Sequence, residues 1–246
     1  MKFAHIAIEG PIGVGKTTLA RALAAQRGAK LLLEEPADNP FLERYYEDMG
    51  RATQRGAGWK GNALALQTQL NFLFQRVEQL AVLKQPGIFE QGLISDFLFA
   101  KDAIFAALTL GDEDLALYRQ IHKRHAQRVP EPDLVIWLHA EPDTLLARIA
   151  RRGLPMERHI TEDYLRALSD AYQRHFTTHR GAPVLAINTE AFHPAADAPD
   201  GPSFRRVLDR IERFKGPFEY FDPPDLPGRA SDGRLVAPKQ GGLIEG

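Results

Sequence analysis

The 246-residue sequence contains no cysteine, which excludes disulfide bonds, thiolate metal sites and a cysteine nucleophile. Its formal net charge is −1, so no overall field attracts nucleic acid or an anionic membrane surface. No apolar run approaches the roughly 20 residues that a membrane span needs. The start, MKFAHIAIEG, reaches a glycine-rich turn too soon to be a secretion signal. We therefore expect a cytoplasmic protein that binds neither nucleic acid nor membrane.

Strand-like and helix-like segments alternate along most of the chain. Apolar residues 3–8 and 30–34 predict buried strands on either side of a glycine-rich turn and a helix over 17–27, which is a unit of a parallel sheet. Further strands are predicted at 88–95, 132–138 and 184–187, and further helices at 40–49, 62–84, 97–110, 112–127, 142–151, 161–178 and 204–214. This alternation predicts an α/β fold with a doubly wound parallel sheet and flanking helices.

Two segments fall outside the alternation. Residues 50–61 are rich in Gly and Arg and read as a mobile loop beside the predicted crevice of the sheet. From Gly216 onward Pro and Gly dominate, so we expect a loosely ordered tail. The predicted organisation is one domain over residues 1–215 and a C-terminal tail over 216–246.

The segment from Gly10 to Thr17, Gly-Pro-Ile-Gly-Val-Gly-Lys-Thr, matches the phosphate-loop pattern G-x-x-x-x-G-K-[ST] without a mismatch. Glycines let backbone N–H groups approach phosphate oxygens, and the helix that follows presents its positive end. We expect Lys16 to bridge the β- and γ-phosphates of ATP and the Thr17 hydroxyl to bind Mg²⁺. The predicted phosphate-binding residues are Gly10, Gly13, Val14, Gly15, Lys16, Thr17 and Thr18.

A phosphate loop identifies a nucleotide site but not a reaction. A GTPase would carry an Asn-Lys-x-Asp motif, which this sequence lacks, and a motor or transporter ATPase usually needs partner domains. A small-molecule kinase needs a base for the acceptor hydroxyl, an acceptor pocket and a mobile cationic lid. The sequence holds candidates for all three.

Carboxylates follow two of the predicted strands. Glu34 and Glu35 precede Pro36, and the carboxyl ends of strands line the ligand crevice of a doubly wound sheet. One of them could accept a proton or hold Mg²⁺; a solvated pair before a turn is the alternative. Asp96 could hold Mg²⁺ through water, and Asp102 could pair with an arginine, although either could also be an ordinary acid at a helix N-terminus.

Two helical faces complete the candidate site. Gln69, Phe72 and Arg76 share one face, and the Gln amide could pair with the edge of a nucleobase, unless the face is an exposed polar stripe. Arg148 and Arg152 lie four residues apart before a flexible Gly-Leu-Pro segment, as a lid over a transferring phosphate would require. Cations at the end of a helix are also expected without any lid.

In this order, the motifs resemble those of the deoxynucleoside kinase family of P-loop kinases, over roughly residues 3–190. The phosphate loop is widespread, whereas Glu35-Pro36, the spacing of Gln69 and Arg76, and the Arg-Ile-x-x-Arg-Gly…Glu lid at 148–157 are more specific. The resemblance implies a homodimer that transfers the γ-phosphoryl group of ATP, with Mg²⁺, to the 5′-hydroxyl of a deoxynucleoside in nucleotide salvage.

The resemblance also implies a role for each candidate residue. Catalytic roles fall to the general base Glu35 and to three cations that stabilise the transferring phosphoryl group, Lys16, Arg148 and Arg152. Metal-binding roles fall to Thr17, Glu35 and, through water, Asp96. Substrate-binding roles fall to three residues that read the nucleobase and two that hold the sugar 3′-hydroxyl, namely Gln69, Arg76, Asp102, Tyr46 and Glu157.

Two positions depart from the family pattern. Phe97 stands where the family usually has an arginine after the strand-end acid, and Leu154 stands where a further lid arginine is common. Two alternatives therefore stay open: a nucleoside-monophosphate kinase of the thymidylate type, against which Phe97 argues, and a nucleotide-binding regulator without transfer activity. The choice between purine and pyrimidine is also open, with a lean to purines from resemblance to bacterial members.

Overall fold

The computed structural model describes residues 2–56, 58–81, 91–126, 129–178, 181–190 and 201–222. Its strands form one six-stranded sheet in the order β2-β3-β1-β4-β5-β6, with every neighbouring pair parallel. In that order the strands are Lys30–Leu32, Leu93–Ser95, His5–Glu9, Leu134–His139, Val184–Asn188 and Phe218–Phe221. The sheet confirms the predicted α/β fold.

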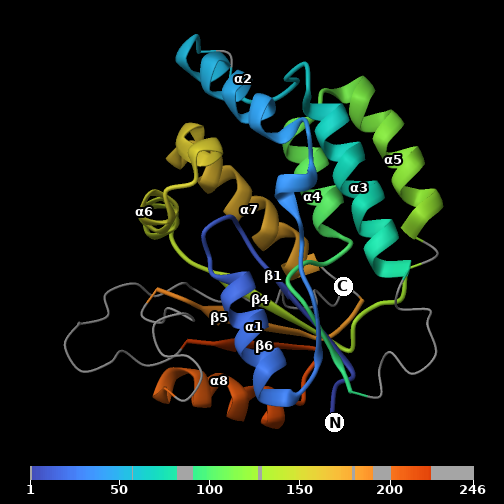
Figure 1. Cartoon of the computed structure of the whole chain (residues 1–246), viewed down its shortest axis with the longest axis vertical. Coiled ribbons are helices and arrows are strands. Elements are labelled where there is room, and N and C mark those ends of the chain that lie inside the picture. The colour runs from blue at the N-terminus through green and yellow to red at the C-terminus, as the bar shows by residue number, and fades with distance from the viewer. Residues whose placement is uncertain are drawn as a thin grey trace, which may run out of the picture.

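Helices cover both faces of this sheet. They are α1 (Lys16–Arg27), α2 (Leu42–Gln54), α3 (Ala65–Ala81), α4 (Lys101–Thr109), α5 (Asp112–Ala126), α6 (Pro142–Arg152), α7 (Glu162–Thr178) and α8 (Pro202–Arg213). Two short 3₁₀ turns, η1 (Pro36–Asp38) and η3 (Pro155–His159), complete the described elements. Figure 1 shows α8 below the sheet and α3, α4, α5 and α7 above it. Within the described ranges, no helix is both long and apolar enough to cross a membrane.

The two central strands explain why the sheet is read easily from the sequence. Residues 6–8 of β1 and 134–136 of β4 are fully buried, because both faces of the sheet are covered by helices. A strand covered on both faces appears as a continuous apolar run. The chain leaves β1 toward one edge and later continues from β4 toward the other, so the crevice at the carboxyl end of β1 is where a ligand is expected.

The predicted boundary at residue 215 needs a correction, because β6 lies in the segment assigned to the tail. Phe218 and Tyr220 are 43% and 42% exposed, so this edge strand lacks the buried apolar run that marked the others. Its partner β5 holds it in the sheet through backbone pairing, which the sequence does not display. Residues 223–246 of the predicted tail lie outside the described residues.

The predicted loop over 50–61 also begins later than expected, since α2 runs to Gln54. Gly50 suggested a helix end, because glycine weakens helices. In the structure it lies inside α2, where an added Cβ would come 2.7 Å from Nδ1 of His159. The glycine therefore lets η3 pack closely against α2 rather than ending the helix. Residues 82–90, the end of one predicted helix and the start of one predicted strand, lie outside the described residues.

Candidate active site

The phosphate loop joins β1 to α1 in a conformation that needs glycine. Gly10 and Gly13 have φ angles of +150° and +84°, and an added Cβ on Gly10 would lie 2.2 Å from the carbonyl oxygen of Leu138. The Lys16 ammonium donates hydrogen bonds to the carbonyl oxygens of Gly10 at 2.8 Å and Pro11 at 3.1 Å. The loop is thus folded with its cation already at the place where phosphates would bind.

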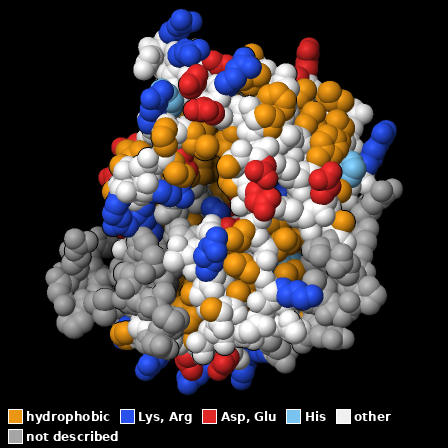
Figure 2. Space-filling view, in the orientation of Figure 1, with side chains coloured by type: hydrophobic (Ala, Val, Ile, Leu, Met, Phe, Trp, Pro, Cys, Tyr) orange, Lys and Arg blue, Asp and Glu red, His pale blue; other side chains and the backbone are white. Residues whose placement is uncertain are grey.

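A pocket of about 320 Å³ lies beside this loop, and Figure 2 shows the molecule hollowed near the middle of the same face. It collects side chains from α1, the end of β2, α2, α3, α4 and the segment after α6. The predicted site residues that line it are Gly13, Lys16, Thr17, Tyr46, Gln69, Arg76, Asp96, Asp102, Arg152 and Glu157. Residues separated by more than a hundred positions in the sequence therefore meet in one cavity.

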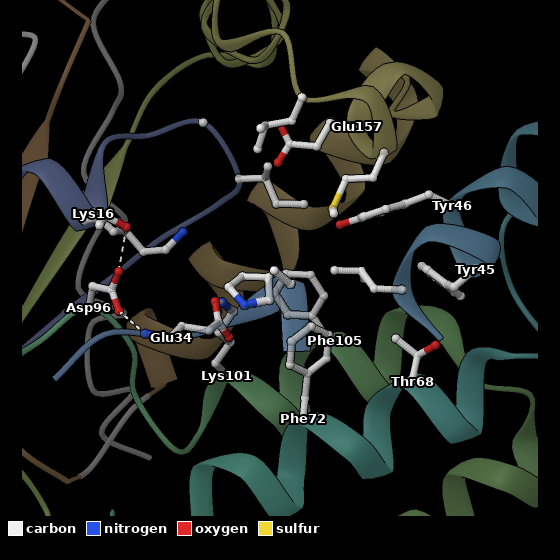
Figure 3. Close-up of a pocket in the computed structure, with 18 of the residues that line it drawn as sticks. Lys16, Glu34, Tyr45, Tyr46, Thr68, Phe72, Asp96, Lys101, Phe105 and Glu157 are labelled. Atoms are coloured by element: carbon white, nitrogen blue, oxygen red, sulfur yellow. Dashed lines mark hydrogen bonds and ion pairs between the residues drawn. The ribbon is translucent and has the colours of Figure 1, made fainter. Parts of the chain in front are cut away.

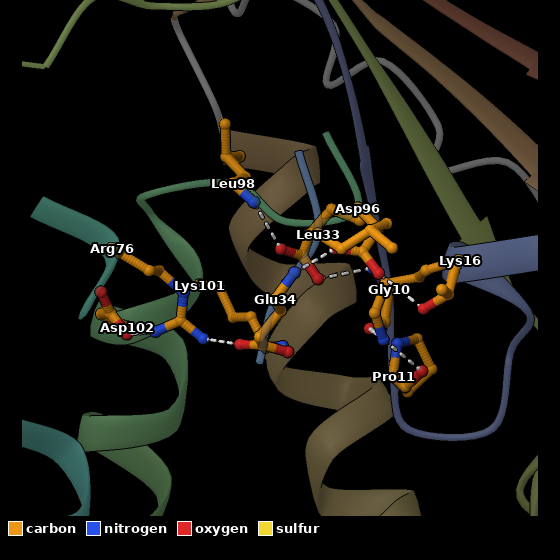
Figure 4. Close-up of polar contacts among 12 residues, drawn as sticks. Gly10, Pro11, Lys16, Leu33, Glu34, Arg76, Asp96, Leu98, Lys101 and Asp102 are labelled. Carbon is orange, nitrogen blue, oxygen red and sulfur yellow. Dashed lines mark hydrogen bonds and ion pairs between the residues drawn. The ribbon is translucent and has the colours of Figure 1, made fainter. Parts of the chain in front are cut away.

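Glu34, and not Glu35, is the acidic residue after β2 that faces the pocket. One oxygen of its carboxylate lies 2.6 Å from the Lys101 ammonium, and the other pairs with Arg76 (Figure 4). Glu35 is exposed and lies outside the pocket, which corrects its expected place as base and metal ligand. Successive residues at a strand end point in opposite directions, so only the three-dimensional path of the chain could select one of the pair.

The charges around Glu34 keep its carboxyl group ionised. Burial raises the pKa of Glu34, but the positive charges of Lys101 and Arg76 outweigh burial and lower the pKa to about 2. Arg76 also pairs with Asp102, as the sequence analysis anticipated. The Arg76 guanidinium lies 5.2 Å from the ring centre of Phe72. These four charged groups form a buried cluster of two cations and two carboxylates.

Asp96 connects the phosphate-loop side of the site to Glu34. Thr17 donates its hydroxyl hydrogen to one carboxylate oxygen of Asp96 at 2.5 Å. The backbone N–H of Glu34 donates to the other oxygen at 2.7 Å (Figure 3). A hydroxyl and a carboxylate oxygen next to the phosphate loop are the hard donors that Mg²⁺ prefers. Through these two hydrogen bonds, Asp96 also links the start of α1 to the segment that follows β2.

Glu9 is a structural part of the site that the sequence analysis missed. It is fully buried at the end of β1 and accepts hydrogen bonds from the Gly10 N–H at 2.8 Å, the Tyr172 hydroxyl at 2.8 Å and the Leu98 N–H at 2.9 Å. A buried carboxylate with this many donors is fully satisfied. It ties the phosphate loop to α7 and to the segment that leads into α4. A single acid ending a buried strand was the available signal.

Aromatic side chains line the middle of the pocket, and two of them lie beside the charged cluster. Figure 3 shows Phe72 and Phe105 between Glu34 and Tyr46, and Tyr45 and Tyr164 also line the pocket. Burial raises the pKa of the Tyr46 hydroxyl, and the negative charges of Glu157 and Glu34 add to this. The pocket is thus apolar in its middle and polar at both ends, which suits a flat ring joined to a hydroxylated group.

The C-terminal end of α6 brings one of the two predicted lid arginines to the pocket. Arg152 makes a paired contact with Glu157, with its Nε and Nη2 lying 3.0 Å and 2.5 Å from the two carboxylate oxygens. Arg148 does not line the pocket; it donates to the Thr189 hydroxyl at 3.0 Å and lies 3.5 Å from the Val14 carbonyl oxygen. It therefore braces the back of the phosphate loop, which corrects its expected place over the transferring group.

The family of this chain follows from comparison with known proteins. Residues 6–211 match the family model described as deoxynucleoside kinase. The chain belongs to the deoxynucleoside kinase family. It is therefore a kinase that phosphorylates a deoxynucleoside, as the resemblance of its motifs implied.

Individual relatives agree with the family. This deoxynucleoside kinase is 35% identical over 169 residues to the deoxyguanosine kinase of Bacillus subtilis, over 68% of this chain and 76% of that protein. It is 33% identical over 190 residues to the deoxyadenosine kinase of Dictyostelium discoideum, over 76% of this chain and 73% of that protein. The structure of deoxyadenosine kinase from M. mycoides with dCMP bound has the same fold, with a TM-score of 0.68, 21% identity, and 85% and 100% of the two chains covered.

This kinase lacks a cation at position 97 and has an unpredicted one nearby. Phe97 is 1% exposed, with its ring centre 5.8 Å from the Arg76 guanidinium, so an apolar side chain fills the place after the strand-end acid. Lys101 lines the pocket instead. A lysine two residues before the largely apolar segment from Ala103 to Leu110 was the signal that could have revealed it.

Proposed function

We propose that this kinase transfers the γ-phosphoryl group of ATP to the 5′-hydroxyl of a purine deoxynucleoside, with Mg²⁺ as cofactor. The observation that carries the proposal is that an ionised, buried carboxylate, Glu34, shares one pocket with Lys16 of the phosphate loop and with the Thr17–Asp96 pair. A base, a phosphate-binding cation and hard metal ligands are the groups that phosphoryl transfer to an alcohol requires.

The loop N–H groups and Lys16 would bind the phosphates, and Thr17 with Asp96 would hold Mg²⁺, which withdraws charge from the phosphate oxygens when bound. Glu34 would accept a hydrogen bond from the 5′-hydroxyl and take its proton as the 5′-oxygen bonds to the γ-phosphorus. The bond from the γ-phosphorus to the β,γ-bridging oxygen would break in the same step and release ADP. A carboxylate with a pKa of about 2 is a weak base, but the transition state of phosphoryl transfer is loose and needs little prior deprotonation. Glu34 then contributes in two ways, by orienting the hydroxyl and by accepting its proton in the transition state.

The far end of the pocket would hold the nucleoside. We propose that Gln69 and the Arg76–Asp102 pair face the base, because an amide and a fixed guanidinium present donors and acceptors in one plane. Gln69 is 3% exposed and lines the pocket. Tyr46 and Glu157 would hold the 3′-hydroxyl. The purine preference is supported by the relatives named deoxyguanosine kinase and deoxyadenosine kinase.

We further propose a cytoplasmic homodimer that functions in nucleotide salvage. Hydrophobic side chains gather over α3 and α5 in Figure 2, and Phe74 and Leu117 on these helices are 45% and 47% exposed. An apolar patch of this kind on a folded domain is typical of a protein–protein contact. The absence of cysteine fits a reducing compartment.

The test is product formation from ATP and Mg²⁺ with each of the four deoxynucleosides, and with the four monophosphates as parallel acceptors. We expect monophosphate products from deoxyguanosine or deoxyadenosine. Faster turnover of a monophosphate would instead identify a nucleoside-monophosphate kinase. ATP binding without transfer to any acceptor would identify a nucleotide-binding regulator.

A further inference from the structure

Lys101 occupies a place where a lysine is unfavourable for folding. Its side chain is 9% exposed, and a buried ammonium is costly unless it is paired. It is also the first residue of α4, where the partial positive charge of the helix end repels a cation. A neutral residue would avoid both penalties, so this position calls for an explanation beyond the packing of α4.

The Lys101 ammonium has hydrogen-bonding capacity beyond its contact with Glu34. Arg76 pairs with both Asp102 and Glu34 and is 3% exposed. The Lys101 ammonium carries three N–H donors, and among the described residues Glu34 is the one acceptor that it contacts, at 2.6 Å. The Lys101 ammonium nitrogen also lies 5.5 Å from the ring centre of Phe105. The side chain is therefore confined between an aromatic ring and the Glu34 carboxylate.

The Lys101 charge is directed toward the phosphate site. Lys101 lines the same pocket as Lys16 of the phosphate loop. Figure 3 shows Lys101 and Glu34 on the side of the pocket that Lys16 and Asp96 occupy. Without Lys101, the cluster would hold Arg76 against two carboxylates, and a net negative charge would face the phosphates of ATP. Two like charges in a partly buried pocket repel strongly.

We propose that Lys101 is a positioning residue for the transfer, and that it holds the Glu34 carboxylate in place and offsets its negative charge beside the incoming γ-phosphoryl group. The inference rests on the function proposed above. It assigns to a helix-borne lysine the cationic role that Phe97 cannot supply. Lys101 acts through Glu34, so its contribution disappears when Glu34 carries no charge.

The first experiment compares Lys101→Met with Lys101→Arg and with Lys60→Met as a matched control. Lys60 is an exposed lysine, with a side chain that is 54% exposed, and pairs with Asp112. We expect Lys101→Met to lower kcat by about 100-fold, the size of effect that follows removal of one preorganised charge from a site. The KM for the deoxynucleoside should change far less, Lys101→Arg should restore part of kcat, and Lys60→Met should match the wild type.

The second experiment places Lys101→Met in a Glu34→Gln background. This double variant loses one cation and one carboxylate together, so the cluster keeps its charge balance and the variant should fold even if Lys101→Met alone does not. If Lys101 acts through Glu34, the second substitution lowers kcat by less than about threefold beyond Glu34→Gln, because coupled sites are non-additive. A further large and independent loss would overturn the proposal.

The outcomes separate this inference from the function on which it rests. A wild-type enzyme that phosphorylates no deoxynucleoside would refute the proposed function. An active wild type together with a Lys101→Met variant whose kcat lies within threefold of it, or whose loss appears only in KM, would refute the role of Lys101 alone. Equal loss in Lys101→Met and Lys101→Arg would mean that the shape of the side chain matters and its charge does not.

Discussion

Replacing Glu34 by Gln removes a single negative charge from between two cations and keeps the shape of the side chain. The carboxylate contacts Lys101 at 2.6 Å and also pairs with Arg76. A Gln amide can still accept one hydrogen bond but cannot take a proton from an attacking hydroxyl. Loss of general-base catalysis typically lowers the rate by about 10²–10⁴-fold, and we expect a fall in kcat within this range.

The cost to stability should be smaller than for a fully buried pair. Removing one partner of a buried ion pair costs about 3–5 kcal/mol. The Glu34 side chain, however, keeps 13% of its surface exposed, and Arg76 retains Asp102 as a partner. We therefore expect a loss of about 1–3 kcal/mol, as for a buried donor left without its acceptor. In a chain of this length, each kcal/mol lowers Tm by about 2–4 °C.

The assay is ADP release under saturating ATP and deoxynucleoside, together with ATP binding and a thermal melt of each variant. Glu35→Gln is the matched control, because it makes the same substitution on the neighbouring, exposed carboxylate. We expect Glu34→Gln to bind ATP but to transfer the phosphoryl group slowly, with kcat in the range given above, and Glu35→Gln to resemble the wild type. If Glu35→Gln is inactive and Glu34→Gln is active, the assignment of the base is wrong.

Three further results are expected. Gln69→Ala should raise the KM for the deoxynucleoside far more than the KM for ATP, and equal changes would remove Gln69 from the base pocket. Burial lowers the pKa of His5 from 6.5 to about 4, so the unfolded chain binds a proton first as the pH falls. The stability that is present above pH 6.5 should therefore drop by about 2 kcal/mol near pH 5. Urea unfolding should show this drop in the wild type and not in His5→Asn, and identical pH dependence in the two would contradict it. Leu117→Asp should shift the protein to monomer in sedimentation velocity if α3 and α5 form the dimer contact, and an unchanged oligomeric state would exclude that face.

Local features of the sequence were enough to predict the fold class and the nucleotide site. The phosphate loop from Gly10 to Thr17 is contiguous, and its glycine geometry depends on φ angles that few other residues adopt. The strands buried on both faces appear as apolar runs, because helices cover them on each side. The Arg76–Asp102 pair could be anticipated because both residues belong to recognisable helices.

Contacts between distant segments decided the rest. The direction in which the chain leaves β2 selects Glu34 over Glu35, and no local pattern distinguishes two adjacent acids before a proline. Lys101 reaches Glu34 only because α4 packs beside α3 at the carboxyl end of the sheet. Arg148 donates a hydrogen bond to Thr189, a partner 41 positions away in the sequence. The sequence by itself determined the fold class and the nucleotide-binding loop. Only the tertiary structure decided which charged groups face the pocket, because the direction of a side chain depends on partners that the local sequence does not contain.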